Sequence, residues 1–255
     1  MIWLLKFTLP AFLVALISLI SRRWGLKVGG AMGGFPVVVG PVLFFFTLEQ
    51  GPDFAAAAAL RSLGSVLAFG LFCMALSWAC LKLPLFLSLL LGWATFLGVS
   101  WLGLRYGSAD LILTFLVAIA CAAAARMFLP GDRRRGERAA KPHDWDIPLR
   151  MAVTVALVVT VTGLAHILGP EWSGVFAAFP VASSILSSFA YHTDGPYGPA
   201  VLLKGSLLGN FSYLTFCAVL AWALPKYGVS ASFLSATFLA MVVQTGALSL
   251  PRKKE

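Results

Sequence analysis

The sequence predicts an all-α polytopic membrane protein with about nine transmembrane helices, arranged as two inverted four-helix repeats joined by one connecting helix. Composition is the first observation, because 60% of the residues are hydrophobic and only 11% are charged, against about a quarter in a typical soluble domain. Several apolar segments also exceed the roughly 20 residues that cross a bilayer. A motif that occurs twice predicts the repeats.

Hydropathy and breaker residues divide the chain into predicted spans. These cover residues 2–21, 28–47, 54–81, 84–104, 109–129, 149–168, 172–191, 197–224 and 229–249. The domain organisation follows as a first four-helix repeat at 1–105, a connecting helix at 106–130, a basic cytoplasmic linker at 131–148, and a second, inverted repeat with a basic tail at 149–255.

The net charge of +9 is distributed as a topology signal rather than as a nucleic-acid-binding patch. In the nine-span prediction, fourteen of the 19 Lys and Arg residues lie on one face, three (Lys6, Arg105 and Lys226) lie on the other, and two lie within spans. The positive-inside rule makes the basic face cytoplasmic. We expect a bacterial inner-membrane protein with its N-terminus outside and its C-terminus inside. Its expected partners include membrane lipid, whose anionic headgroups the linker is a candidate to contact.

The repeat is visible at an offset of 144 residues. Phe35-Pro36 matches Phe179-Pro180, and Gly51-Pro52 matches Gly195-Pro196. Gly30 matches Gly174, and Phe72-Cys73 matches Phe216-Cys217. An unpaired fifth span between the two units would invert the second unit relative to the first, an architecture typical of secondary transporters.

Pro36 and Pro180 each interrupt the second span of a unit. Proline removes a backbone donor and clashes with the preceding turn, and the carbonyl groups that it frees need protein or water as partners. Two interpretations follow. Either two broken helices face each other at an internal cavity that binds substrate, or both prolines are ordinary kinks in well-packed helices.

Arg61 and Lys204 are charged residues inside predicted spans, each at a similar depth from its own end. Because an ion in the membrane interior is costly unless it faces a cavity or a partner, both are candidates to bind an anionic substrate. The alternative is that each side chain extends to the nearer surface, or pairs with Glu49, Asp53 or Asp194 as a structural lock.

Weaker candidates lie around these residues. Ser184, Ser188 and Tyr191 share one helix face, which predicts either substrate contacts or hydrogen bonds between helices. The acidic and histidine residues of the two Gly-Pro turns predict either proton coupling or solvated turns; they are Glu49, Asp53, His192 and Asp194. Close spacings of small residues, such as Gly205 and Gly209, predict tight helix packing within the chain or in a homodimer.

The pattern of a helix, a short basic loop, a helix centred on "GGFPVVV", and a third helix with an early Arg resembles the small four-helix inner-membrane proteins of the GlpM type. Each half of the chain is similar to one such protein, so the whole resembles two fused copies. The resemblance implies a link to exopolysaccharide production. It carries over no site residues beyond the Phe-Pro pairs and Arg61 with Lys204, which replaces the arginine in the second half.

Three functional hypotheses remain. The first is a secondary transporter, or exporter, of a small anionic or zwitterionic solute. The second is a non-transporting subunit that supports envelope or exopolysaccharide assembly, and the third is a flippase for a lipid-linked phosphate. No cluster of nucleophile, base or metal ligands lies within the spans, and the four cysteines form no paired motif, so we expect neither an enzyme, a disulfide, a metal nor a cofactor.

Overall fold

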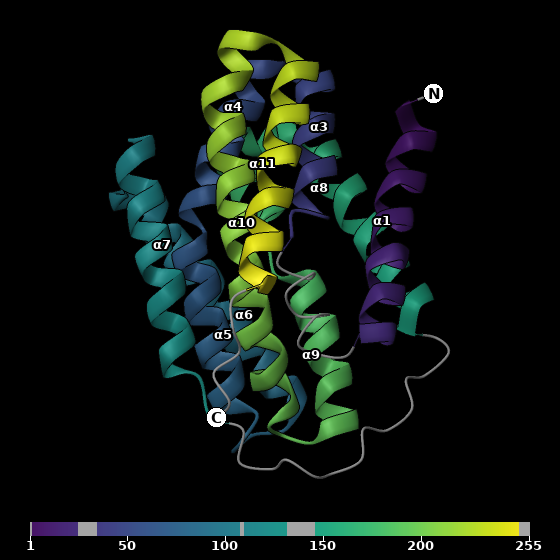
Figure 1. The fold of residues 1–255 in the computed structure, drawn as a ribbon, viewed down its shortest axis with the longest axis vertical. Helices are drawn as coiled ribbons and strands as arrows, with labels where there is room; N and C mark the ends of the chain where they lie inside the picture. The colour runs from purple at the N-terminus through teal and green to yellow at the C-terminus, as the bar shows by residue number, and fades with distance from the viewer. Residues whose placement is uncertain (1, 25–34, 108–109, 132–145, 250–255) are drawn as a thin grey trace.

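The computed structural model describes residues 2–24, 35–107, 110–131 and 146–249, and within these ranges all regular elements are α-helices (Figure 1). In chain order they are α1 (Ile2–Trp24), α3 (Val39–Glu49), α4 (Pro52–Gly64), α5 (Val66–Ala79), α6 (Leu85–Tyr106), α7 (Leu111–Phe128), α8 (Asp146–Ala177), α9 (Val181–Asp194), α10 (Gly198–Tyr227) and α11 (Val229–Ser249). The predicted all-helical class is confirmed for these residues.

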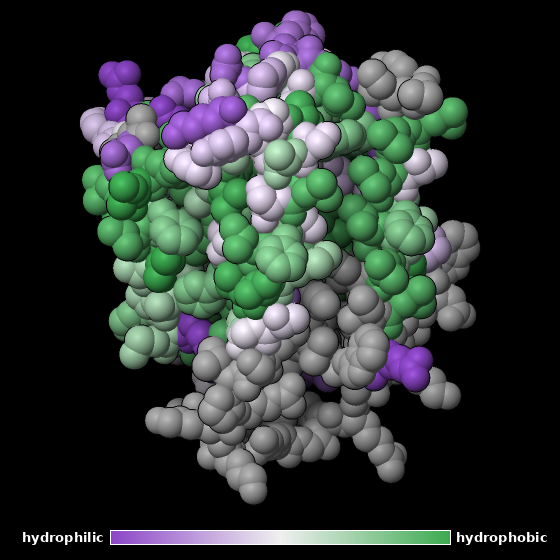
Figure 2. Space-filling model, turned by 45° about the horizontal axis from the view of Figure 1, so that its top comes forward, coloured by the Kyte–Doolittle hydropathy of each residue, from purple (hydrophilic) through white to green (hydrophobic). Residues whose placement is uncertain are grey.

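Six helical stretches of the described chain are long and apolar enough to cross a membrane. They are Pro52–Ala79, Leu85–Tyr106, Leu111–Phe128, Met151–Asp194, Gly198–Tyr227 and Val229–Ala247. Large apolar side chains such as Phe86, Ile112 and Phe238 are exposed on their outer faces, and Figure 2 shows apolar residues covering the flanks of the molecule. An apolar surface of this extent would be unfavourable in water. The chain is therefore a membrane-embedded helical protein.

The stretch from Met151 to Asp194 has 44 residues, and a straight helix of that length would extend for about 66 Å, twice the thickness of a bilayer core. Two breaks divide it. Gly169 has φ 69° and ψ 172°, a conformation that strongly favours glycine, and Pro170 begins the next helical segment. The second break separates Ala177, the last residue of α8, from Val181, the first of α9.

The second break falls at the predicted Phe179-Pro180, and Pro36 likewise precedes α3 instead of lying inside a helix. Pro180 therefore marks an interruption between two helices rather than a kink, and Pro36 lies just before the first turn of α3. Figure 1 shows α3 in the upper half of the bundle and α9 in the lower half, each ending at its own end of the molecule. The N-terminal ends of both half-helices consequently lie near the middle.

Some helix boundaries in the second half lie at or near the offset found in the sequence. Leu85 and Val229, the first residues of α6 and α11, differ by 144. The long stretches Pro52–Ala79 and Gly198–Tyr227 begin 146 residues apart and end 148 residues apart.

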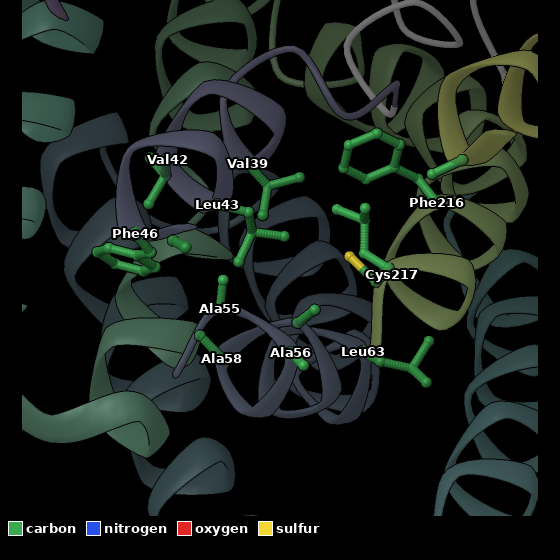
Figure 3. Packing of buried hydrophobic residues seen from close by; sticks show 14 of the residues in the cluster. Val39, Val42, Leu43, Phe46, Ala55, Ala56, Ala58, Leu63, Phe216 and Cys217 are labelled. Carbon is green, nitrogen blue, oxygen red and sulfur yellow. The ribbon is translucent and has the colours of Figure 1, made fainter. Parts of the chain in front are cut away.

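These two long stretches are the central helices. In each, 56% of the most apolar window is buried, compared with 17% to 28% in the other four spanning stretches. The larger core cluster joins α3 and α4 to α10, where Val39 and Leu43 approach Phe216 and Cys217 (Figure 3). A second cluster joins α5 and α6 to α9 and α10. Residues from both halves of the chain therefore build each core.

Several predicted boundaries need adjustment. The predicted second span, 28–47, is described only from Phe35 onward, and its helix runs from Val39 to Glu49. The third span, predicted as 54–81, consists of two helices that meet at Ser65 and end at Ala79. Most of the predicted linker, residues 132–145, lies outside the described residues, and α8 already begins at Asp146.

Candidate functional site

The Phe-Pro break before α9 is held in place by α6. The Phe179 ring lies 5.5 Å from that of Phe96 and 6.0 Å from that of Trp93, measured between ring centroids. The Trp93 indole N–H donates to the Ser184 hydroxyl at 2.9 Å, and this hydroxyl donates to the Pro180 carbonyl at 2.7 Å. Ser184 thus ties the first turn of α9 to a helix from the other half of the chain.

Neither half-helix has a side-chain cap at its N-terminus. Backbone groups satisfy much of each first turn. In α3 the N–H groups of Gly40 and Val42 donate to Pro36 and Val38, at 2.9 Å and 3.3 Å, and Pro41 has no N–H. In α9 those of Val181 and Ser184 donate to Phe179 and Pro180, at 2.8 Å and 2.9 Å. The helix dipole makes such an end favourable for negative charge. Two such ends face the middle of the bundle from opposite directions (Figure 1).

Arg61 lies in the last turn of α4, and its guanidinium forms an ion pair with Glu171 in the segment that follows the Gly169 break. Next to it, the Ser62 hydroxyl donates to the Gly174 carbonyl at 2.7 Å. Gly174 approaches α4 so closely that a Cβ atom there would overlap the Ala58 carbonyl oxygen. Residues 170–177 are therefore fastened to α4 beside Arg61.

Glu171 was not among the predicted partners of Arg61, which were Glu49, Asp53 and Asp194. The two residues lie 110 positions apart, so no local pattern connects them. The only signal in the sequence was a carboxylate directly after the Gly169-Pro170 breaker pair.

Lys204 lies in the first third of α10 and is half-buried. Within the described part of the chain its side chain has no ion pair or hydrogen bond, and its carbonyl accepts from Arg126 at 3.3 Å. On the same helix the Tyr213 hydroxyl donates to the Ser62 carbonyl at 3.2 Å. Because Ser62 follows Arg61 in the chain, Tyr213 lies at about the same level along the bundle axis as Arg61. Lys204 precedes Tyr213 by about 14 Å of helix. The structure places the two predicted cations on neighbouring helices but at different heights.

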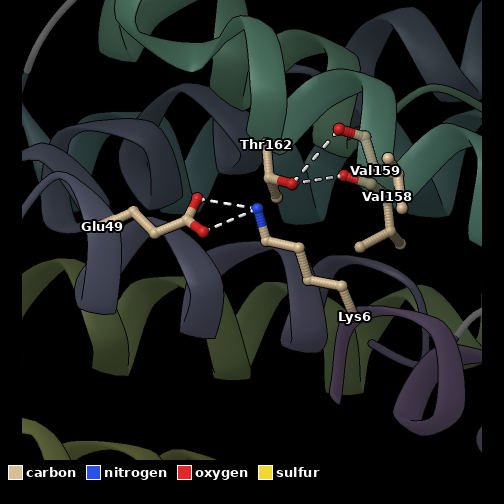
Figure 4. Close-up of polar contacts among 5 residues, drawn as sticks. All are labelled: Lys6, Glu49, Val158, Val159 and Thr162. Carbon is tan, nitrogen blue, oxygen red and sulfur yellow. Dashed lines mark hydrogen bonds and ion pairs between the residues drawn. The ribbon is translucent and has the colours of Figure 1, made fainter. Parts of the chain in front are cut away.

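Glu49, a predicted proton-coupling residue, is paired with Lys6 (Figure 4). The Lys6 Nζ atom lies 2.7 Å and 2.8 Å from the two carboxylate oxygens and 5.7 Å from the centroid of the Phe45 ring. The Lys6 side chain is 2% exposed and that of Glu49 is 26% exposed. This pair fastens α1 to the end of α3. The available signal for this pair was a lysine in an otherwise apolar helix. The topology prediction places Lys6 on the outer surface instead.

The other predicted residues are spread along α9 and the turns. Ser188 donates to the Ser184 carbonyl at 2.8 Å, and Tyr191 is half-buried with its ring against that of His192. The Asp194 carboxylate accepts from Thr193 at 2.6 Å. Asp53 is exposed in the first turn of α4. His192 is exposed, so the Gly-Pro turns are solvated where described.

Five buried polar groups of the described residues have no hydrogen-bond partner. They are the hydroxyls of Ser77, Ser100, Ser173 and Ser187 and the side-chain amide nitrogen of Asn210. An unpartnered polar group in a dry interior is costly, so these atoms are candidates to bind water or a ligand.

A pocket of about 670 Å³ lies between the α4–α5 stretch, α6 and α7, and Arg61 is part of its lining. Most of the other lining side chains are apolar, with Ser65, Ser100, Tyr106 and Thr114 as the polar exceptions. A concave, mainly apolar site with a few polar groups is typical of small-molecule binding. No group of three or more His, Cys, Asp or Glu side chains occurs in the described chain to hold a metal ion.

Comparison of the chain with protein-family models, with characterised proteins and with solved structures finds no match. The resemblance to GlpM-type proteins therefore stays a prediction, and the functional argument depends on the geometry above.

Proposed function

We propose that the protein is a secondary transporter of a small anionic or zwitterionic solute, which works by alternating access between two inverted repeats. The observation that carries the proposal is the pair of short helices α3 and α9, which each follow a Phe-Pro pair and whose N-termini, without side-chain caps, face the middle of the bundle. Broken helices at the midplane, with their positive ends directed at an anionic substrate, are a recurring feature of secondary transporters.

The matching helix boundaries support the repeat. A first unit of α1, the span ending in α3, the α4–α5 stretch and α6 corresponds to a second unit of α8 up to Leu168, the segment Pro170–Asp194, α10 and α11. With α7 between the units, this gives nine spans. The opposite locations of α3 and α9 in Figure 1 are those that an inversion about an axis in the membrane plane would produce.

In this proposal Arg61 and Lys204 serve opposite states of access. The two residues occupy nearly equivalent positions on the central helices of the two units, yet they lie at different heights, so they cannot share one small anion in this structure. If the two repeats exchanged their conformations, Lys204 would enter an environment like the one that Arg61 occupies in this structure. The Lys6–Glu49 pair closes α1 onto α3 in the present state, and Glu49 is the carboxylate that proton coupling would use.

The proposed location is the bacterial inner membrane, with the basic face in the cytoplasm. This location rests on the charge distribution of the sequence and on the resemblance to GlpM-type proteins.

The test is thermal unfolding of the purified protein against a panel of inorganic anions, organic acids, amino acids and phosphate esters, followed by flux measurements in proteoliposomes. A ligand that binds only the folded state raises its apparent stability by RT ln(1 + [L]/Kd). We expect one ligand class to stabilise the wild type and to be taken up. Arg61→Gln and Lys204→Gln should abolish uptake, whereas Arg105→Gln, at an exposed cation near the end of α6, should not.

If no ligand changes the stability and neither substitution has an effect beyond that of Arg105→Gln, the transport proposal is wrong. The function as a non-transporting subunit of envelope or exopolysaccharide assembly would then be the better hypothesis.

A further inference from the structure

The pocket beside Arg61 lies where two consecutive helices separate. α6 and α7 both pack against α5 rather than against each other. The pocket is lined by the last two turns of α6, from Val99 to Gly107, and by the first two turns of α7, from Leu113 to Ala118. It therefore lies toward the end of the bundle where α6 is connected to α7.

The lining of the pocket includes Arg61 and Ser65. It also includes Val175, which lies one turn after Glu171 on the same helix face. The Arg61–Glu171 pair therefore borders the pocket. In the described contacts, the guanidinium donates to this carboxylate through one of its nitrogen atoms, and arginine carries five N–H donors.

Apart from Ser100, Tyr106 and Thr114, the other lining residues are apolar or glycine, and the pocket is open to the lipid-facing surface. Leu102, Leu113 and Val117 belong to its lining and are 47%, 52% and 45% exposed on the outside of the helices. A small hydrated anion would gain nothing from these walls, whereas an alkyl chain would gain free energy from burial. A membrane-derived ligand can enter between α6 and α7 without crossing water.

We propose that this pocket binds an anionic amphiphile from the membrane. Its phosphate or carboxylate group pairs with Arg61 in place of Glu171, while its alkyl chain lies between α6 and α7. The inference rests on the proposed function in one respect, that Arg61 binds the anionic group of the substrate. It narrows the substrate class from a free anion to an anion that carries an apolar chain.

Two glycines of α6 provide a matched pair of variants. Gly98 and Gly103 are both exposed, and a Cβ atom at either would have no neighbour within 4 Å. Only Gly103 belongs to the pocket. Gly103→Phe should therefore fill the pocket, and Gly98→Phe should place the same ring on the outer surface at a similar cost to the fold.

The probes are inorganic phosphate, alkyl phosphates of increasing chain length, and dodecanol as the uncharged analogue, titrated into the protein in nanodiscs of zwitterionic lipid. We expect affinity to rise with chain length by up to about fourfold per methylene. Dodecyl phosphate should bind the wild type and Gly98→Phe equally and Gly103→Phe at least tenfold more weakly. Arg61→Gln should lose the preference for the phosphate over the alcohol.

Two outcomes overturn the inference. If inorganic phosphate binds as tightly as dodecyl phosphate and Gly103→Phe behaves like Gly98→Phe, the substrate is a free anion, and the transport proposal survives without the pocket. If dodecanol matches dodecyl phosphate in the wild type, the pocket is a site for neutral lipid only. Binding that needs Arg61 and an open pocket, without any flux in proteoliposomes, would confirm the site and contradict transport.

Discussion

Lys6 and Glu49 form an ion pair whose two members differ in exposure. The ammonium is almost fully buried at 2%, whereas the carboxylate is 26% exposed. Removing one member of a buried pair is costly when the other remains in a low-dielectric environment. We expect Glu49→Gln to lower the free energy of unfolding by about 3 kcal/mol, and Lys6→Met by about 1 kcal/mol, because the remaining Glu49 can reach water.

Unfolding of the purified protein by denaturant measures both values, with Lys82→Met at an exposed turn as the control for loss of a positive charge. A cost of Lys6→Met equal to or above that of Glu49→Gln would contradict this account of the pair.

Arg61 and Glu171 differ from that pair, because the Glu171 side chain is 51% exposed and the Arg61 side chain is 20% exposed. Exposed ion pairs contribute about 0 to 1 kcal/mol to stability. We expect Glu171→Gln to change the free energy of unfolding by less than about 1 kcal/mol and to tighten binding of the anionic ligand, because a competing carboxylate is removed. Ligand titration of the variant measures this. Weaker binding, together with a large loss of stability, would identify the pair as a structural lock instead.

At the residue scale the sequence identified candidate charged residues better than it identified the residues that they contact. Arg61 and Lys204 stand out in apolar spans because of their charge, whereas the topology prediction places Lys6 on the outer face. Their contacts depend on segments far away in the chain, since Glu171 lies 110 residues from Arg61 and Ser184 lies 91 residues from Trp93. No periodicity or spacing encodes such pairings.

At the scale of elements, the close crossing of α8 and α4 at Gly174 decides whether residues 170–177 can dock. A Cβ atom there would overlap the Ala58 carbonyl oxygen and lie 2.9 Å from the Arg61 Cβ. Overpacking of this kind costs about 1 to 3 kcal/mol. We expect Gly174→Ala to lower the unfolding free energy by about that amount and to impair ligand binding, because Arg61 is displaced.

The matched control is Gly163→Ala on the same helix, where a Cβ atom has no neighbour within 4 Å. Alanine has a higher helix propensity than glycine by about 1 kcal/mol, so this variant should be as stable as the wild type or more so. Equal effects of the two substitutions on unfolding would show that the crossing is not tightly packed.

The elements that the sequence predicted best are those marked by proline. Pro36 and Pro180 precede the first turns of α3 and α9, where a missing backbone N–H is tolerated. Pro10 and Pro225 lie inside α1 and α10, so a proline alone does not predict a break. The break at Gly169 was predicted only as a boundary between two spans. Its positive φ angle could not be predicted, because a glycine in the sequence is compatible with many backbone conformations. The division of the third span at Ser65 follows Gly64, but a single glycine inside an apolar helix does not by itself predict a break.

At the scale of the whole molecule, the proposed inversion makes the two Gly-Pro turns face opposite sides of the membrane. Gln50 lies at the end of α3, and Pro196 lies between α9 and α10; both are exposed. The native Cys73, Cys80 and Cys217 are buried and Cys121 is half-buried, so a membrane-impermeant maleimide should report mainly on cysteines that are introduced.

We expect Gln50→Cys and Tyr106→Cys to react with the maleimide in intact cells, because both lie on the face opposite to the basic segments. Leu83→Cys and Pro196→Cys should react only after the membrane is permeabilised. The chain without an added cysteine gives the background. Because Tyr106 and Leu83 flank α6 and are exposed, they report the two faces independently of the repeat. Labelling of Gln50→Cys and Pro196→Cys from the same side would exclude inverted repeats, and with them the symmetry that relates Arg61 to Lys204.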